Sequence, residues 1–294
     1  MKRVIVLAGP TASGKTKLGT ALAEIQNGEI VSADSMQIYR DLPIATAQPT
    51  EEEKKGIPHH LIGFLPHDAR FTVADWREEA LRTIRDIFSR GKTPIVVGGT
   101  GMYIRYLIYE PSFGAESDPA VREKLAPLSN EELLARLLKQ DARITVSVND
   151  RKRLLRYNEV LLLNGRLPAR EREKNTEFAF SLFCLCPDRA ELYEKIDRRV
   201  DEMFARGLFD EIRALRQKGV SEEAQCYKAI GCRQLIDVLE GRASLEEARE
   251  AIKRESRRYA KRQITWMKSE QAVRIAAWDT ETRIRIILKT LERI

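Results

Sequence analysis

The feature that most constrains the fold is a segment close to the N-terminus, residues 9–16, with the sequence GPTASGKT. It follows an apolar run, residues 4–8, that predicts a buried strand, and it precedes an alanine- and leucine-rich stretch with helical spacing. The segment matches the pattern G-x4-G-K-[ST] in full, in the strand-to-helix context where this pattern forms a P-loop. The chain is therefore expected to begin with a parallel strand that leads directly into a helix.

The same segment predicts a phosphate site. Glycines let the backbone approach phosphate oxygens closely, and unpaired amides at the helix N-terminus point at those oxygens. Lys15 adds a positive charge, and the hydroxyl of Thr16 is placed to hold Mg²⁺. The predicted phosphate-binding residues are Gly9, Pro10, Thr11, Ala12, Ser13, Gly14, Lys15 and Thr16.

Alternating strand and helix patterns predict an α/β core. Residues 29–32 are predicted to form a short strand, and the apolar runs at residues 94–97 and 178–186 have the composition of buried strands. Residues 73–90 have the apolar spacing of an amphipathic helix. This alternation is typical of a parallel sheet that is flanked by helices on both faces.

A change of pattern in the middle of the chain predicts a second structural unit. From about residue 118 to residue 175 the sequence is highly charged and helical in spacing, with no convincing strand. The economical interpretation is a P-loop core of residues 1–114 and 177–294, interrupted by a helical insert at 115–176.

The carboxylates that follow predicted strands indicate what kind of P-loop protein this is. A motor NTPase normally needs an aspartate after a second apolar strand, but the run at 95–97 ends in Gly-Gly-Thr. The nearest candidate is Asp34, which follows the strand at 29–32 and so lies at the carboxyl edge of the sheet, where such folds place their chemistry. Asp34 is either a general base or a group that holds a magnesium-bound water or caps a helix.

Two basic segments are present in a chain whose formal net charge is +7. Residues 249–274 contain nine Lys or Arg against three Glu, and residues 151–170 contain six against one. Because each phosphate that is neutralised releases counterions, concentrated positive charge predicts a polyanionic partner. The alternative interpretation is a pair of solvated helix faces.

Helical spacing in the C-terminal basic segment predicts which side would contact nucleic acid. Arg254, Arg258 and Arg262 recur at every fourth position and so line one helical face, with Arg257 and Lys261 beside it. The opposite side is predicted to face the core through residues that recur at every seventh position, namely Ile252, Tyr259 and Trp266.

Composition disfavours several classes of protein. No run of 18 apolar residues is present and the first residues lack a signal-peptide layout, so we expect a cytoplasmic protein that does not contact a membrane. The four cysteines do not form paired CxxC units, which favours free thiols over a zinc site. Nothing indicates a self-complementary surface, and a monomer is expected.

Six segments together resemble one family, the tRNA dimethylallyltransferases, also called tRNA isopentenyltransferases. Each segment is short, but all occur in the family's order and together they extend over nearly the whole chain. They are GPTASGKT at 9–16, SADSMQIY at 32–39, PHHL at 58–61, GGTGMY at 98–103, DPAVR at 118–122 and YAKRQITW at 259–266.

The resemblance implies transfer of a dimethylallyl group from dimethylallyl diphosphate to the exocyclic N6 amine of the adenosine 3′-adjacent to the anticodon of tRNA, with release of diphosphate. Lys15 and Thr16, with Mg²⁺, would stabilise the leaving pyrophosphate, and Asp34 would take the proton from the amine. Thr100 would help hold the base or the transferring group. This agrees with elementary chemistry, since an allylic cation-like carbon needs a neutralised leaving group and an aromatic amine is a poor nucleophile. The implied catalytic residues are Asp34, Lys15, Thr16 and Thr100.

By the same resemblance the macromolecular partner is the anticodon stem-loop of tRNA, contacted by both the core and the helical insert. Its base must leave the stack before a pocket can reach it. Arg122 would contact either the tRNA or the diphosphate. The implied tRNA-binding residues are Asp34, Ser35, Met36, Gln37, Thr100, Arg122, Lys152, Arg153, Arg156, Arg233, Arg257, Arg258, Lys261 and Arg262.

The sequence departs from the family in some details. The family usually has Gln where Lys152 stands, Ala-Leu at Tyr157 and Asn158, and an aromatic residue at Cys232. His59 and His60 are expected to be core or loop-anchoring residues rather than catalytic ones.

Three other functions share parts of this pattern. A small-molecule P-loop kinase would share the fold and the phosphate site, but it leaves the basic C-terminal helix unexplained. An isopentenyltransferase that acts on free AMP or ADP would use the same chemistry without RNA. A nucleic-acid-binding ATPase is disfavoured because the second strand ends without a carboxylate.

Overall fold

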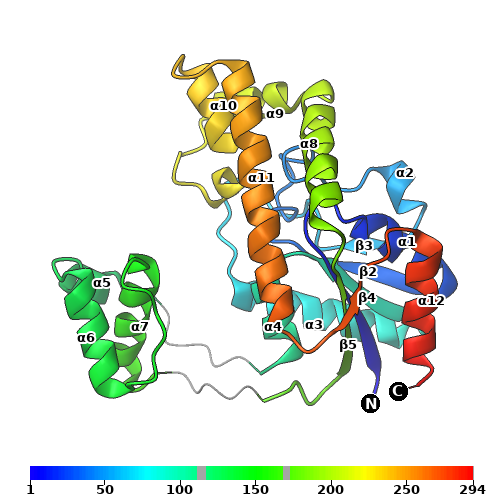
Figure 1. Ribbon diagram of the computed structural model, residues 1–294, viewed down its shortest axis with the longest axis horizontal. Helices are drawn as coiled ribbons and strands as arrows, with labels where there is room; N and C mark the ends of the chain where they lie inside the picture. The colour runs from blue at the N-terminus through cyan, green and yellow to red at the C-terminus, as the bar shows by residue number, and fades with distance from the viewer. Residues whose placement is uncertain (111–116, 168–172, 294) are drawn as a thin grey trace. The chain divides into compact units, whose positions relative to one another are not determined.

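The computed structural model describes residues 1–110, 117–167 and 173–293 (Figure 1). The chain divides into two compact units, one made of Met1–Ile108 with Asn175–Ile294 and the other of Tyr109–Lys174. The insert predicted at 115–176 begins and ends slightly later than this second unit, and its predicted start falls outside the described residues.

A six-stranded sheet forms the centre of the larger unit, and every pair of strands in it is parallel. This confirms the α/β fold class. The order is β3-β2-β4-β1-β5-β6, so β1, which leads into the P-loop, is an interior strand. The strands are β1 (Arg3–Ala8), β2 (Gly28–Ala33), β3 (His59–His60), β4 (Thr93–Gly98), β5 (Ala179–Leu185) and β6 (Val273–Ile275).

Helices cover both faces of the sheet. Successive side chains of β1 point to opposite faces, so Val4 and Val6 belong to one apolar cluster while Ile5 and Leu7 belong to another. Burial on both faces explains why the strand is apolar at every position from Val4 to Ala8. The first face is covered by α3 (Val73–Ser89) and α4 (Gly101–Ile108), and the second by α1 (Lys15–Ile25) and α12 (Thr280–Leu291) (Figure 1).

A group of helices beyond the sheet has its own apolar core. This core also contains Ile38, Tyr39 and Leu42, so the segment that follows β2 is held against these helices. Figure 1 shows α8 and α11 running side by side, and the two are in contact. The group comprises α8 (Arg189–Ala205), α9 (Leu208–Gln217), a 3₁₀ turn (Gln225–Lys228), α10 (Cys232–Leu239) and α11 (Leu245–Lys268).

The smaller unit is helical in its described residues. Its helices are held together by a small apolar core of Leu125, Leu133, Leu137 and Leu154. Each helix begins at a polar cap, because the side chains of Asp118, Ser129 and Asp150 accept hydrogen bonds from the first-turn amides. The helices are α5 (Pro119–Leu125), α6 (Asn130–Gln140) and α7 (Arg151–Asn164).

Two further expectations concern membranes and thiols. Among the residues that the structure describes, no helix combines the length and the apolar character that a membrane span requires. The four cysteines are free thiols, as predicted, and three of them are buried.

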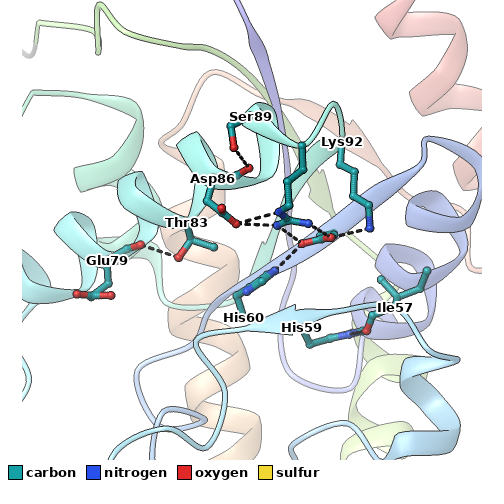
Figure 2. Close-up of polar contacts among 10 residues, drawn as sticks. Ile57, His59, His60, Glu79, Thr83, Asp86, Ser89 and Lys92 are labelled. Atoms are coloured by element: carbon teal, nitrogen blue, oxygen red, sulfur yellow. Dashed lines mark hydrogen bonds and ion pairs between the residues drawn. The ribbon is translucent and has the colours of Figure 1, made fainter.

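A buried carboxylate fixes the edge of the sheet. Glu29 of β2 is 1% exposed and accepts hydrogen bonds from Lys92 Nζ at 2.7 Å and from Arg90 Nη2 at 2.7 Å. His60 Nε2 lies 2.8 Å from the same carboxylate, and Figure 2 shows His60 and Lys92 pointing toward this cluster. The pKa of Glu29 lies well below its usual range. The largest cause is its hydrogen bonding with Arg90, and burial opposes the shift.

Replacing Glu29 by Gln is expected to reduce the free energy of unfolding by about 2 kcal/mol at pH 7, because hydrogen bonds to a charged group are worth about 1.5–3 kcal/mol. The folded-state pKa is depressed, so this contribution is present above the unfolded pKa of about 4.3 and is lost as the pH falls below it. Urea unfolding of wild type and variant at several pH values measures the difference.

The matched control is Glu281→Gln, which removes an exposed partner of Arg285 and should change stability by less than about 0.5 kcal/mol. A Glu29→Gln protein as stable as wild type at pH 7 would contradict the structural role of the cluster.

Candidate functional site

The P-loop turns sharply between β1 and α1. Gly14 has φ 78°, a left-handed conformation that favours glycine, and Ala12 has φ 60°. A Cβ on Gly9 would lie 2.5 Å from Ser13 Oγ and 3.3 Å from Leu185 Cβ, so a larger residue there would crowd both side chains. Because α1 begins at Lys15, its first amides have no partner within the helix and are available to an anion.

Two cations converge on this loop. Lys15 Nζ donates to Pro10 O at 3.3 Å, and Nη1 of Arg199, from α8, donates to Thr11 Oγ1 at 3.3 Å. Burial, with the nearby charge of Arg199, lowers the pKa of Lys15 to about 8 against the attraction of Asp34. Burial likewise lowers the pKa of Arg199, again opposed by Asp34. The three charges therefore belong to one electrostatic site.

Sequence reasoning missed Arg199. The buried residues of α8 are Leu192, Ile196, Val200 and Met203. Arg199 comes three residues after Ile196 and four before Met203, so it lies on the buried side of an amphipathic helix. A charged residue on that side is the signal that would have found it.

A pocket joins the P-loop to the end of β2. Lys15 and Thr16 line it from the start of α1, and Asp34 and Gln37 line it from the segment after β2. The structure thus brings the predicted phosphate ligands and the predicted base to one pocket. Its other lining residues are Ile30, Ser32, Pro49, His59, Ile62, Val97 and Gly98.

Backbone amides orient the carboxylate of Asp34. Its Oδ1 accepts hydrogen bonds from Met36 N at 2.9 Å and Gln37 N at 3.4 Å, which is the geometry of an Asx turn. No described residue donates to Oδ2 in the structure. Ser35 N donates to Thr100 Oγ1 at 3.0 Å, so Thr100 lies beside this turn. One carboxylate oxygen therefore fixes the turn, and the other can accept a proton.

Gln263 of α11 links two loops of the site. Its Oε1 accepts a hydrogen bond from Thr11 N at 2.9 Å, and its Nε2 donates to Gly99 O at 3.0 Å. Gln263 is 5% exposed, and a Cβ on Gly99 would lie 2.1 Å from Nε2. Tyr259, one turn earlier on α11, has its pKa raised by burial and by the charge of Asp34. The YAKRQITW segment therefore supports the P-loop, a role that the sequence did not indicate.

The adjacent histidines of β3 have different surroundings, as Figure 2 shows. His60 contacts Glu29, whereas His59 Nδ1 donates to Ile57 O at 2.8 Å. His59 also lines the pocket, where its Nε2 is buried with no hydrogen-bond partner among the described residues, and burial lowers its pKa. Both contacts agree with the predicted anchoring role.

The basic residues of α11 have different exposures. Arg257 is half-buried, and its Nη1 lies 2.6 Å from an oxygen of Asp197 on α8. Arg233, at the start of α10, is exposed. The exposed basic residues of α11 around the predicted face are Arg254, Arg258, Lys261 and Arg262.

The predicted core-facing stripe of α11 is only partly buried. Ile252 is buried, whereas Tyr259 and Trp266 are half-buried. Trp266 nevertheless packs against the apolar cluster that covers the first face of the sheet. The buried residues of α11 are Ala248, Ile252, Ala260, Gln263 and Met267.

In the smaller unit, two of the implied tRNA-binding residues form ion pairs. Arg122 Nε and Arg156 Nη1 lie 3.1 Å and 2.7 Å from the carboxylate of Glu159, which is fully buried. Burial raises the pKa of Glu159, but the contacts with these arginines outweigh that effect and lower this pKa to about 2. Lys152 and Arg153 are exposed at the start of α7.

Comparison with known proteins places these features in a family. Residues 37–270 match the family described as IPP transferase, and residues 2–64 match the one described as isopentenyl transferase. The tRNA dimethylallyltransferase of Alkaliphilus metalliredigens is 42% identical, over 99% of this chain and 97% of that protein. The tRNA dimethylallyltransferase of Bacillus licheniformis is 43% identical, over 94% of this chain and 90% of that protein.

Solved structures agree with this result. The tRNA delta(2)-isopentenylpyrophosphate transferase of Staphylococcus epidermidis has a TM-score of 0.76 and 37% identity, covering 100% of this chain and 99% of that one. A eukaryotic dimethylallyltransferase that acts on tRNA has a TM-score of 0.79 and 31% identity, covering 91% of this chain and 70% of that one. With its P-loop, its Asp34 turn and matches along almost its full length, the chain belongs to the IPP transferase family of tRNA dimethylallyltransferases.

Proposed function

We propose that this protein transfers the dimethylallyl group of dimethylallyl diphosphate to the exocyclic N6 amine of the adenosine 3′-adjacent to the anticodon of tRNA, and releases diphosphate. The observation that carries the proposal is that Lys15, Thr16 and Asp34 line one pocket. A phosphate cradle and a carboxylate in a shared pocket suit a reaction in which a diphosphate leaves as a proton is removed.

The P-loop would act on the leaving group. As the bond between the allylic carbon and the diphosphate oxygen breaks, negative charge grows on the diphosphate. The amides at the start of α1 and the cations of Lys15 and Arg199 lie where they would neutralise that charge. Because these groups are held in place before the reaction, little reorganisation is needed during it.

Asp34 would act on the nucleophile. The N6 nitrogen forms the new bond to the allylic carbon and becomes positively charged unless a proton leaves. Oδ2 of Asp34 would accept that proton, while the amides of Met36 and Gln37 hold Oδ1. Thr100, beside the turn, would help position the base. The base itself must be flipped out of the anticodon loop to reach the pocket.

Magnesium is the metal that the site would hold. Among the described residues, no group of three or more His, Cys, Asp or Glu side chains is arranged as a metal cage. This fits Mg²⁺, which usually binds through one or two protein oxygens, substrate phosphates and water, and the Thr16 hydroxyl lines the pocket. When bound, Mg²⁺ would supply Lewis-acid neutralisation of the diphosphate oxygens.

Labelled dimethylallyl diphosphate distinguishes this function from its rivals. The protein is incubated with the labelled donor and, in separate reactions, with bulk tRNA, AMP or ADP. We expect label to move only to tRNA. Transfer to AMP or ADP would instead support the free-nucleotide enzyme, and ATP-dependent phosphorylation without prenyl transfer would support a kinase.

The depressed pKa of Lys15 predicts how donor binding depends on pH. The protonated amine attracts the anion, so its contribution is present below about pH 8 and is lost as the pH rises through that value. Above it, the affinity of wild type for inorganic pyrophosphate should fall by up to about tenfold per pH unit relative to Lys15→Met. Calorimetric titrations of both proteins from pH 6.5 to 9.5 give the ratio of the two affinities. The ionisation of pyrophosphate itself affects both proteins alike and so does not change this ratio. A constant ratio between the two affinities would argue against Lys15 as a ligand.

The role of Asp34 is tested by Asp34→Asn, which keeps the size of the side chain and removes the proton acceptor. Single-turnover rates should fall by about 10²–10⁴ if Asp34 is the general base. Affinities for tRNA and for the diphosphate should change little, since proton removal matters in the transition state. Magnesium titration separates the alternative role, because recovery of most activity at high Mg²⁺ would indicate that Asp34 holds the metal. We expect no recovery.

The exposed face of α11 predicts the salt dependence of tRNA binding. Neutralising Arg254 and Arg258 by Gln should weaken binding to all substrate tRNAs alike and lower the salt slope of log Kd by about 2. Affinity for pyrophosphate should not change. The matched control is the pair Arg82→Gln and Arg285→Gln, exposed on α3 and α12. Equal salt slopes in wild type and the α11 variant would make this a solvated helix face without a role in binding.

A further inference from the structure

A buried guanidinium lies directly behind the P-loop. Arg283, in the first turn of α12, is 2% exposed. Its Nη1 donates to Ser13 O at 2.8 Å, and its Nε donates to Ala277 O at 2.6 Å. Its Nη2 has no hydrogen-bond partner among the described residues. The side chain thus ties the C-terminal helix to the loop and retains unused hydrogen-bonding capacity.

This buried cation lacks a paired carboxylate among the described residues. The acidic groups near it, Asp279 and Glu191, act through longer-range attraction, and burial lowers the pKa of Arg283. The ring of Trp278 lies 5.4 Å from the guanidinium, and Lys195 lies 4.1 Å from the same ring. A buried cation that is not neutralised is costly, so an anion bound nearby would stabilise it.

Peptide geometry connects Arg283 to the inside of the phosphate cradle. In a planar trans peptide the C=O of Ser13 and the N–H of Gly14 point in opposite directions. Because Arg283 holds the Ser13 carbonyl on the outer side, the Gly14 N–H points to the inner side, where phosphate would lie. A Cβ on Gly14 would be 3.3 Å from Arg283 Nη1, so the guanidinium is packed closely against this peptide.

We propose that Arg283 is a positioning residue for diphosphate binding, which rests on the function proposed above. It fixes the orientation of the Ser13–Gly14 peptide and polarises it, so that the Gly14 N–H becomes a stronger donor to a diphosphate oxygen. The bound diphosphate is the anion that the buried guanidinium otherwise lacks. No covalent change occurs at Arg283.

The test uses three variants and inorganic pyrophosphate as the probe. Arg283→Met removes the charge, and Arg283→Lys keeps the charge but cannot span the Ala277 and Ser13 carbonyls with one amine. Arg285→Met is the matched control, because Arg285 is on the same helix, is 70% exposed and pairs with Glu281. Calorimetry gives the pyrophosphate Kd at 20 °C, and thermal unfolding with and without pyrophosphate shows that each variant is folded at that temperature.

We expect pyrophosphate affinity to fall by about tenfold in Arg283→Met, equivalent to 1.4 kcal/mol, and by about threefold in Arg283→Lys. Arg285→Met should bind like wild type, and all three variants should bind an anticodon stem-loop RNA equally. In the transfer assay the KM for dimethylallyl diphosphate should rise by the same factors while kcat changes less. A purely structural role would lower the melting temperature and leave the pyrophosphate Kd unchanged.

A folded Arg283→Met protein whose pyrophosphate Kd is within twofold of wild type overturns the proposal. If that variant does not fold, Arg283→Lys is the test, and wild-type affinity of Arg283→Lys for pyrophosphate would also overturn the proposal. Failure of wild type itself to bind pyrophosphate would overturn the P-loop as donor site and this inference with it. Wild-type binding together with an unaffected Arg283 variant would refute this inference alone.

Discussion

The carboxyl ends of three strands approach one another so closely that no side chain fits between them. A Cβ on Gly98 would lie 2.1 Å from Ala33 O. Across the same contact Gly9 N donates to Gly98 O at 3.2 Å, and Thr100 N donates to Ala33 O at 3.1 Å. Parallel strands end at a common edge, so these contacts bring together the P-loop after β1, Asp34 after β2 and Thr100 after β4. The shared pocket depends on this spacing.

Positive charge reaches the P-loop from three different helices. Lys15 comes from α1, Arg199 from α8 and Arg283 from α12, and burial lowers the pKa of each. Such cations repel one another in a region of low dielectric constant, and a bound anion relieves that repulsion. A diphosphate carries enough charge to do so. Because its charge increases as the allylic bond breaks, the same arrangement would stabilise the transition state more than the ground state.

Features with a local signal could be predicted from the sequence, and features created by packing could not. The P-loop, the strand alternation and Asp34 are each indicated by their neighbours in the chain. Gln263 and Arg283 reach the loop from positions 252 and 270 residues away from the groups they contact. No spacing rule says which helix delivers a side chain across such a distance. Arg199 lies between these two cases. Its place on the buried side of α8 could be predicted from helical spacing, but the group that it contacts could not.

The number of basic residues in a segment of the sequence overstates how many of them are available to bind RNA. Arg122 and Arg156 contact the buried Glu159, and Arg257 contacts Asp197, so these arginines already have partners. An arginine that must leave or share a carboxylate gains less from a phosphate than an unpaired one does, because part of the new attraction replaces an old one. A buried glutamate within a basic segment therefore acts mainly on shape, since it fixes α5 against α7. Electrostatic attraction of RNA is then expected to come chiefly from exposed residues that do not contact a buried carboxylate, namely Lys152, Arg153, Arg254, Arg258, Lys261 and Arg262. Two of these have partners at the surface, since Arg153 pairs with Asp150 and Arg258 pairs with Glu255.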